Sequence, residues 1–219
     1  MAKNVSSSVG GKAKRAAPGA DGLLESALRC FYQYGYAGTS VRQIASDAHV
    51  TVAALYHHFE SKQEMLVSIM TSAMEAALND AQAAYESAEP VPAEQLRALV
   101  AAMVRYHTRH QTEAFVGNSE LRSLEKPHRS DVIALRDAHE AIMRKVISDG
   151  VADGSFHVDQ PERAARAVIA MCIAVASWYQ KGGSLTPSDI SDLYSQYALN
   201  LVGYRAKTSP ARRGASARS

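Results

Sequence analysis

Signals that start an α-helix recur at short intervals between Gly35 and Leu66. The tetrapeptide that begins at Ser40 matches a capping box, Thr51 can cap a second helix, and Ser61 begins another capping box. Each signal opens a new helix before the preceding one can lengthen. The segment can therefore hold only short helices joined by tight turns, and this limits the possible folds more than any other feature of the sequence.

The helices around these signals form a compact unit. Apolar residues at three- and four-residue steps predict a first helix that Gly35 is placed to stop. Two short helices follow, joined by a tight turn at His49 and Val50, and such a pair forms a helix-turn-helix. The three helices and the long helix after them are expected over residues 21–34, 41–48 and 51–58 and from Ser61 onward.

The remaining chain has the same helical character. Ala, Leu, Val, Met and Arg dominate, Pro is scarce between the termini, and alternating strand patterns are hard to find. The predicted fold class is all-α. Further helices are expected to begin at Pro92 and to cover residues 115–124, 129–150, 161–181 and 187–204.

Positive charge collects at the two ends of the chain, although the formal net charge is only +2. Both ends are rich in Ser, Gly and Ala and lack apolar periodicity, so residues 1–19 and 206–219 are predicted to be disordered. Such segments can simply aid solubility, or the N-terminal arm can touch DNA phosphates next to the helix-turn-helix. The basic residues are Lys3, Lys12, Lys14, Arg15, Arg205, Lys207, Arg212, Arg213 and Arg218.

Cysteine usage and hydropathy favour the reducing cytoplasm. Cys30 and Cys172 lie far apart in apolar helical contexts, with no Cys-x-x-Cys pair that would indicate a zinc site or a disulfide framework. The longest apolar run, residues 164–179, is interrupted by Arg166 and is too short to cross a bilayer. We expect a cytoplasmic protein without a membrane partner.

The segment from Gly38 to Met70 resembles the DNA-binding domain of the TetR family of transcriptional regulators. His49 departs from the pattern, because the family usually has Gly at this turn position; His tolerates left-handed backbone better than most residues. The matching residues are Gly38-Thr39-Ser40-Val41-Arg42-Gln43-Ile44-Ala45, Val50-Thr51, Leu55-Tyr56-His57-His58-Phe59, Ser61-Lys62 and Leu66.

This resemblance implies which residues meet DNA. Small side chains near Thr51 permit close approach to the major groove, while Leu55 and Phe59 anchor the helix and Tyr56 and His57 project outward. The resemblance implies phosphate contacts by Tyr56, Lys62 and either Thr39 or Ser40. The candidates for contacts near the bases are Arg42, Thr51, Ala53 and His57. The implied partner is double-stranded DNA carrying an inverted-repeat operator.

Later residues resemble one subgroup of that family, which responds to acyl-CoA thioesters. The resemblance implies a helix-turn-helix domain over residues 20–66 and a helical ligand-binding and dimerisation domain over residues 67–205. The alternative effector is a drug-like or aromatic ligand. The matching segments are Phe115-Val116, Glu120-Leu121-Arg122-Ser123-Leu124, Arg136-Asp137, Gly150, Asp153-Gly154-Ser155-Phe156, Trp178-Tyr179 and Gly183-Ser184-Leu185-Thr186-Pro187.

Apolar residues mixed with a few polar groups are typical of ligand sites, although a plain packed core has the same pattern. Arg122 and Arg136 could meet coenzyme A phosphates, or could form surface salt bridges. The pocket candidates are Met103, Tyr106, His107, His110, Phe115, Asn118, Leu121, Arg122, Met143, Ile147 and Trp178.

Apolar residues nearly encircle the helix expected over residues 161–181. A helix covered in this way must be buried on two sides. One side suits the core of the monomer, and the other suits a twin helix across a two-fold axis. We therefore expect a homodimer formed through the last two long helices, with Trp178 at or near the interface.

A metal site and an enzyme are the interpretations of the sequence that compete with DNA binding. His107, His110 and Glu113 stand at three-residue steps, but ligands from one helix rarely close a metal site, so neither a metal nor a cofactor is expected. An enzyme is the distant alternative, since the sequence has no nucleophile elbow, no His-Glu-x-x-His run and no glycine-rich phosphate loop.

Overall fold

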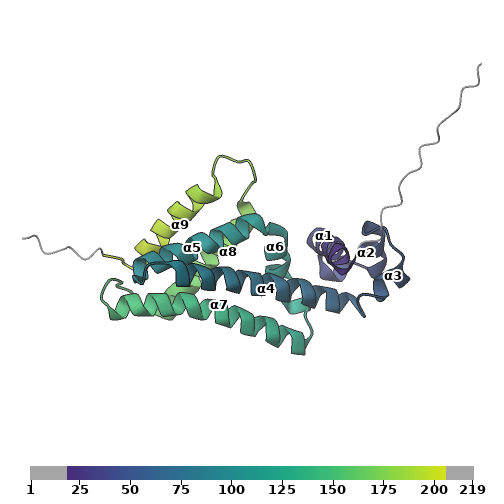
Figure 1. Cartoon of the computed structure of the whole chain (residues 1–219), viewed down its shortest axis with the longest axis horizontal. Coiled ribbons are helices and arrows are strands. Elements are labelled where there is room, and N and C mark those ends of the chain that lie inside the picture. The colour runs from purple at the N-terminus through teal and green to yellow at the C-terminus, as the bar shows by residue number, and fades with distance from the viewer. Residues whose placement is uncertain (1–18, 206–219) are drawn as a thin grey trace, which may run out of the picture.

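The computed structural model describes residues 19–205, so the predicted basic arm and basic tail lie outside the described residues, apart from Gly19 and Arg205. Within this range the fold is all-α, as the sequence predicts (Figure 1). The elements are α1 (Ala20–Gly38), α2 (Val41–Asp47), α3 (Val52–Tyr56), α4 (Lys62–Ser87), α5 (Pro92–Arg109), α6 (Gln111–Ser119), the 3-10 turn η1 (Leu121–Ser123), α7 (Lys126–Ala152), α8 (Pro161–Trp178) and α9 (Pro187–Leu201).

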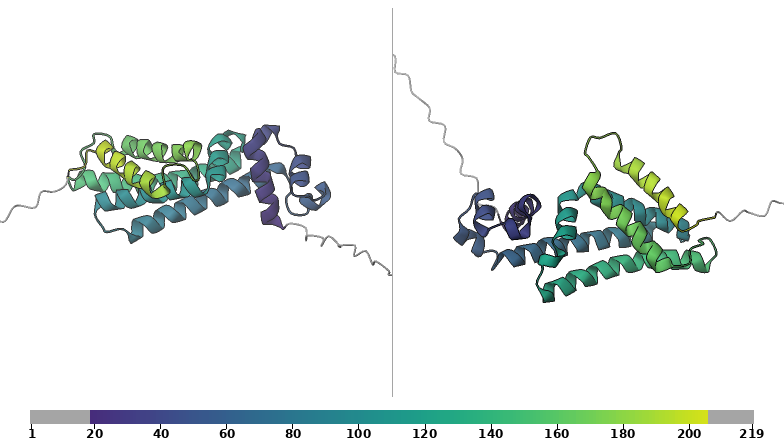
Figure 2. Two further views of the ribbon diagram at one scale, coloured as in Figure 1. Left: turned by 90° about the horizontal axis from the view of Figure 1, so that it is seen from above. Right: turned by 180° about the vertical axis from the view of Figure 1, so that it is seen from behind.

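The helices form a small unit at one end and a larger bundle along the rest of the molecule. Helices α1–α3 are grouped around the start of α4, and α4 runs from them into the bundle (Figures 1 and 2). In the bundle α5 packs against α4, α8 and α9, while α7 packs against α4 and α8. Because α4 spans the boundary predicted at residues 66 and 67, one continuous helix joins the two parts.

Two hydrophobic clusters match this division. The first surrounds Phe31, Ile44 and Leu55 in the small unit and includes Val116 and Val132 from α6 and α7. The second lies among α4, α5, α7, α8 and α9. The small unit is therefore packed onto α6 and α7 as well as onto α4.

Capping residues start the helices where the sequence predicts. Ser40 accepts a hydrogen bond from the Gln43 N–H, and the Gln43 side chain accepts one from the Ser40 N–H, which completes the capping box. At the start of α4 the Ser61 hydroxyl accepts a hydrogen bond from the Glu64 N–H. The Glu64 carboxylate, however, accepts the N–H of Glu60 and not that of Ser61. The second predicted box is therefore only half formed.

Several helix boundaries differ from the prediction. Gly35 has a φ of 69° and interrupts α1 as expected, but one further turn extends α1 to Gly38. The predicted helix over residues 115–124 is two elements, because the chain leaves helical geometry at Glu120. Pro127 lies in the first turn of α7, where a missing N–H costs no hydrogen bond, and so it starts the helix that it was expected to precede.

The turn between α2 and α3 has the left-handed conformation that its position in the motif predicts. His49 has a φ of 57°, and no other non-glycine residue among residues 19–205 has a positive φ. This backbone conformation is less favourable for a residue with a Cβ atom than for glycine. The turn is thus a point of local strain inside the helix-turn-helix.

His49→Gly is expected to raise the free energy of unfolding by about 1 kcal/mol, because glycine adopts positive φ without the Cβ clash. Urea unfolding followed by circular dichroism measures the change. His49→Ala is the matched control, since it removes the imidazole but keeps the Cβ. If the free energy of unfolding rises equally in both variants, then the imidazole side chain, and not the backbone conformation, limits stability at this turn.

No helix within residues 19–205 is both long enough and apolar enough to span a membrane.

Candidate DNA interface and ligand cavity

Helices α2 and α3 are held by their apolar residues and leave their polar residues exposed. Leu55 and Phe59 are buried, so they anchor α3 to the small unit as the four-residue spacing predicts. The next side chains point away from that core: Tyr56 is 51% exposed and His57 is also exposed. The local sequence therefore presents one face of α3 to solvent and binds the other to the protein.

The starts of both helices are also accessible. Ser40 caps α2 and Thr51 caps α3, and both side chains lie at the surface. Arg42 and Ala53, in the first turns of the same helices, are also exposed. Two exposed helix N-termini with small side chains suit an anionic surface that comes close to the backbone.

Thr39 corrects one part of the predicted interface. Its side chain is 2% exposed, and its hydroxyl is hydrogen-bonded to the carbonyl oxygens of Cys30 (3.0 Å) and Gly35 (2.8 Å). A hydroxyl buried and hydrogen-bonded in this way is not presented to a phosphate, so the structure favours the other alternative, Ser40. Ser40 is the accessible member of the pair that the resemblance suggested.

Lys62 has a structural role that the sequence did not reveal. Its ammonium donates to the carbonyl oxygens of Tyr36 (2.7 Å) and Thr39 (2.6 Å) and lies 4.2 Å from the centre of the Tyr36 ring. Burial lowers the pKa of Lys62, an effect partly offset by the negative charge of Glu120. The side chain thus ties the end of α1 to the start of α4, and its contact with a phosphate stays a prediction.

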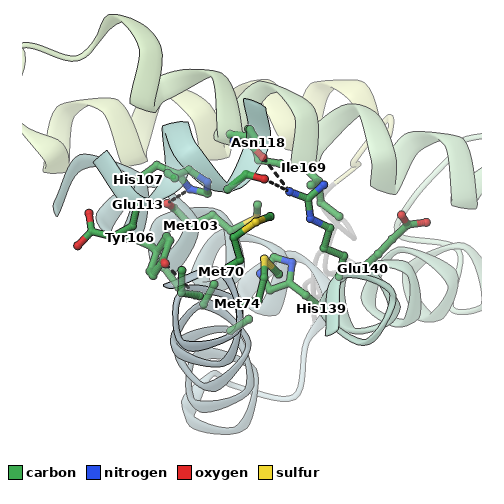
Figure 3. A pocket seen from close by; sticks show the side chains of 18 residues that line it. Met70, Met74, Met103, Tyr106, His107, Glu113, Asn118, His139, Glu140 and Ile169 are labelled. Carbon is green, nitrogen blue, oxygen red and sulfur yellow. Dashed lines mark hydrogen bonds between the residues drawn. The ribbon is translucent and has the colours of Figure 1, made fainter. Parts of the chain in front are cut away.

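A cavity of about 230 Å³ lies in the bundle, beyond the small unit. Side chains from α4, α5, α6, α7 and α8 converge on it (Figure 3). The lining is mainly apolar, with a few polar groups. It consists of Met70, Ala73, Met74, Ala77, Ala81, Ala102, Met103, Tyr106, His107, Glu113, Ala114, Gly117, Asn118, Arg136, His139, Glu140, Ile169 and Ile173.

The cavity includes only part of the predicted pocket. Met103, Tyr106, His107 and Asn118 line it, as expected. Met143 and Ile147 belong instead to the hydrophobic core, which has the same helical periodicity as a cavity wall. The other candidates that do not line it are His110, Leu121, Arg122, Phe115, which is 44% exposed beside Tyr32, and Trp178, which is 42% exposed beside Tyr194.

The polar groups of the cavity are held in defined states. The Nδ1 of His107 lies 2.8 Å from the Met103 carbonyl oxygen, so Nδ1 carries the proton and Nε2 keeps a lone pair. Burial lowers the pKa of His107, and burial together with the charge of His107 lowers the pKa of His139 to about 4. The Tyr106 hydroxyl donates to the Ala73 carbonyl oxygen at 2.7 Å, and burial raises its pKa to about 12.

His107, His110 and Glu113 do not share one helix. His107 lies in α5, His110 occupies the junction between α5 and α6, and Glu113 lies in α6. The His110 imidazole pairs with the Glu113 carboxylate at 3.5 Å. In the part of the chain that the structure covers, no three His, Cys, Asp or Glu side chains are grouped so as to hold a metal ion.

Sequence and structure comparisons agree with this division of the chain. Residues 23–69 match the family model for bacterial regulatory proteins of the tetR family, and residues 89–202 match the C-terminal domain of tetracycline-repressor-like proteins. The transcriptional repressor KstR2 of Mycolicibacterium smegmatis is 27% identical over 184 residues, which cover 83% of this chain and 89% of the relative.

Two solved structures have the same fold. A tetR-family regulatory protein from Rhodococcus RHA1 superposes with a TM-score of 0.79 at 28% identity, covering 85% of this chain and 98% of that one. AibR in complex with isovaleryl coenzyme A and operator DNA superposes with a TM-score of 0.75 at 24% identity, covering 85% and 99%. The two family models together span the small unit and most of the bundle, and the chain belongs to the TetR family of DNA-binding transcriptional regulators.

Proposed function

We propose that this regulator is a homodimeric repressor that binds an inverted-repeat operator and releases it when a small effector enters the cavity. The proposal rests on one helix, α4. Its first turns hold the small unit that carries the exposed α2–α3 face, and its following turns line the cavity. The small unit packs around the first turns of α4, and Met70, Met74 and Ala77 of the same helix line the cavity. A ligand that displaces α4 would therefore displace the DNA-binding face.

A second connection supports this coupling. The Gln63 amide, in the first turn of α4, lies 2.8 Å from the Tyr36 hydroxyl of α1. With its nitrogen toward Tyr36, the same amide also donates to the Ser123 carbonyl oxygen at 3.3 Å and accepts the Glu125 N–H at 3.0 Å. The small unit is thus linked to the segment that leads into α7, a helix that lines the cavity with Arg136.

The exposed surface of α8 and α9 supports a homodimer. Leu193, Tyr197 and Leu201 recur every four residues on α9, and all three are exposed large apolar side chains. On α8 the exposed residues include Ala170 and Ala174, whose small side chains let another helix approach closely. Helices α8 and α9 would pair with their copies across a two-fold axis, which buries both stripes.

An acyl-CoA thioester is the effector that we propose from the resemblance to acyl-CoA-responsive regulators. AibR, which has the same fold, was crystallised with isovaleryl coenzyme A. The cavity volume of about 230 Å³ suits the acyl group alone, since pockets for drug-sized ligands measure about 300–1,000 Å³. The coenzyme would remain outside the cavity. A compact aromatic or drug-like ligand is the second candidate, because the lining is rich in methionine, whose side chain adapts to irregular shapes.

Tyr56→Phe tests the DNA-binding face. Loss of the exposed hydroxyl is expected to weaken operator binding about 10-fold, because a hydrogen bond to a charged phosphate contributes about 1.5–3 kcal/mol. Fluorescence anisotropy with labelled DNA measures the affinity. Because a phosphate contact carries no sequence information, binding to unrelated DNA should weaken by the same factor.

Tyr34→Phe is the matched control, since Tyr34 is also an exposed tyrosine but lies on α1. It should leave the affinity unchanged. An unchanged affinity for Tyr56→Phe would remove the phosphate contact from the proposal.

A further inference from the structure

We infer that the effector presents a carboxylate to Arg136 inside the cavity, which makes it a compact organic acid with an apolar body. This inference rests on the proposed effector function of the same cavity. The acid could be free, or it could be the far end of a dicarboxylic acyl thioester. The two sources share the chemistry that Arg136 would recognise, and the experiment below separates them.

Arg136 is a partly buried cation with no anionic partner among residues 19–205. Its Nη2 donates to the Gly117 carbonyl oxygen at 2.7 Å and contacts the Asn118 side-chain oxygen at 3.4 Å, and both acceptors are neutral. No carboxylate of residues 19–205 lies within 4.0 Å of the guanidinium. Burial alone lowers the pKa of Arg136. A partly buried charge without a counter-charge loses part of its hydration, and an anionic ligand would compensate for that loss.

The hydrogen-bonding capacity of Arg136 is only partly used. Arginine has five N–H donors, and the contacts within the described range involve only Nη2. Nε and Nη1 therefore keep donors for a ligand. A carboxylate is the group that best matches two neighbouring guanidinium N–H donors, because its two oxygens can accept them in parallel.

The two acidic side chains of the lining are already engaged elsewhere. Glu140 lies one turn from Arg136 on α7, but its carboxylate pairs with Arg166 at 3.0 Å and lies 3.9 Å from Arg144. Glu113 of α6 pairs with His110 and is partly exposed. Neither carboxylate neutralises Arg136, so the positive charge stays available to a ligand.

The two imidazoles of the cavity do not compete for the anion at neutral pH. His107 is 8% exposed, and its Nε2 has no hydrogen-bond partner among residues 19–205. Both histidines have lowered pKa values, so both are uncharged at pH 7. The other titratable groups that line the cavity are Tyr106, Glu113, Arg136 and Glu140, from α5, α6 and α7; α4 and α8 contribute none. Arg136 is therefore the charge that selects the ligand.

The dimensions of the cavity limit the apolar body of the acid. A volume of about 230 Å³ lies below the range of about 300–1,000 Å³ found for pockets of drug-sized ligands, which favours a small acid. Met70, Met74 and Ile169 line the cavity among its polar groups and would contact this body (Figure 3). Branched, cyclic or aromatic acids of this size fit, and the nucleotide of coenzyme A does not.

The test compares acids with their uncharged amides in isothermal titration of the full-length protein. The probes are benzoate, cyclohexanecarboxylate and isovalerate, each paired with its primary amide. Wild-type protein should bind at least one acid about 10-fold or more tightly than its amide, since a hydrogen bond to a charged group contributes about 1.5–3 kcal/mol. Glutaryl coenzyme A and isovaleryl coenzyme A form the thioester arm, in which only the glutaryl group ends in a carboxylate.

Two substitutions assign the preference to Arg136. Arg136→Gln should abolish the preference for acid over amide, while Arg136→Lys should keep part of it because the charge remains. Arg144→Gln is the matched control, since Arg144 lies on the same helix but does not line the cavity. The ratio of acid to amide affinity cancels any general loss of folding in a variant.

The outcomes separate this inference from the proposed function. The carboxylate inference is wrong if every amide binds as tightly as its acid or more tightly. It is also wrong if isovaleryl coenzyme A releases the operator while no carboxylate probe binds. In both cases the cavity remains the proposed effector site. A preference for acids that depends on Arg136 supports the inference. If such acids bind without changing operator affinity, the carboxylate inference holds and the proposed effector function fails.

Discussion

Ala174→Arg is expected to convert the protein from a dimer to a monomer and to lower operator affinity by more than about 100-fold. Ala174 is exposed on α8, so an arginine there leaves the core of the monomer intact. In the proposed dimer the same position faces the partner helix, where an arginine is too large and its charge has no partner. A loss of 100-fold corresponds to about 2.7 kcal/mol, and a monomer loses one of two half-sites.

Sedimentation velocity measures the oligomeric state, and anisotropy measures operator binding on the same samples. Ala138→Arg is the matched control, because Ala138 is an exposed alanine on α7, outside the proposed interface. It should remain dimeric and bind normally. A dimeric, operator-binding Ala174→Arg variant would place the interface on another surface.

Gly150→Ala is expected to lower the free energy of unfolding by about 2–3 kcal/mol, although alanine is the better helix former by about 1 kcal/mol. A Cβ at this position in α7 would lie 2.2 Å from Cδ2 and 2.7 Å from Cγ of Phe156. Phe156 is buried in the core of the bundle and packs edge to face with Tyr204. The whole ring would have to move, and the cost of overpacking outweighs the gain in helix propensity.

Chemical denaturation of Gly150→Ala beside Gly117→Ala measures this difference. Gly117 lies in α6, and a Cβ there meets no other atom within 4 Å, so alanine should stabilise the protein by about 0.5–1 kcal/mol. A stabilised Gly150→Ala variant would mean that the ring of Phe156 can move without loss of packing.

The small unit could be predicted from the sequence because local signals specify it. Ser40 and Thr51 cap helices through their own side chains, and Leu55 and Phe59 are buried as their spacing indicates. The role of Lys62 was missed, because its partners are carbonyl oxygens more than twenty residues earlier in the chain. Only the folded structure brings these groups together.

The cavity was harder to predict, because helical periodicity does not distinguish a core from a cavity wall. Met143 and Met103 occupy equivalent apolar stripes, yet only Met103 lines the cavity. One signal was available: Arg136 and His139 share the face of α7 that also carries the buried Val132 and Met143. Polar residues within an otherwise buried stripe indicate a site, and this pattern places Arg136 inside the cavity.

The proposed function is tested most directly by selecting bound sequences from random duplex DNA with the full-length protein and then titrating the selected site with a ligand of the cavity. We expect an inverted repeat with half-site centres about 34–36 Å apart, bound by one or more dimers and released by the ligand. The proposed function would be contradicted if the protein selects no common sequence. It would also be contradicted if the selected site lacks two-fold symmetry and no ligand of the cavity alters binding to it.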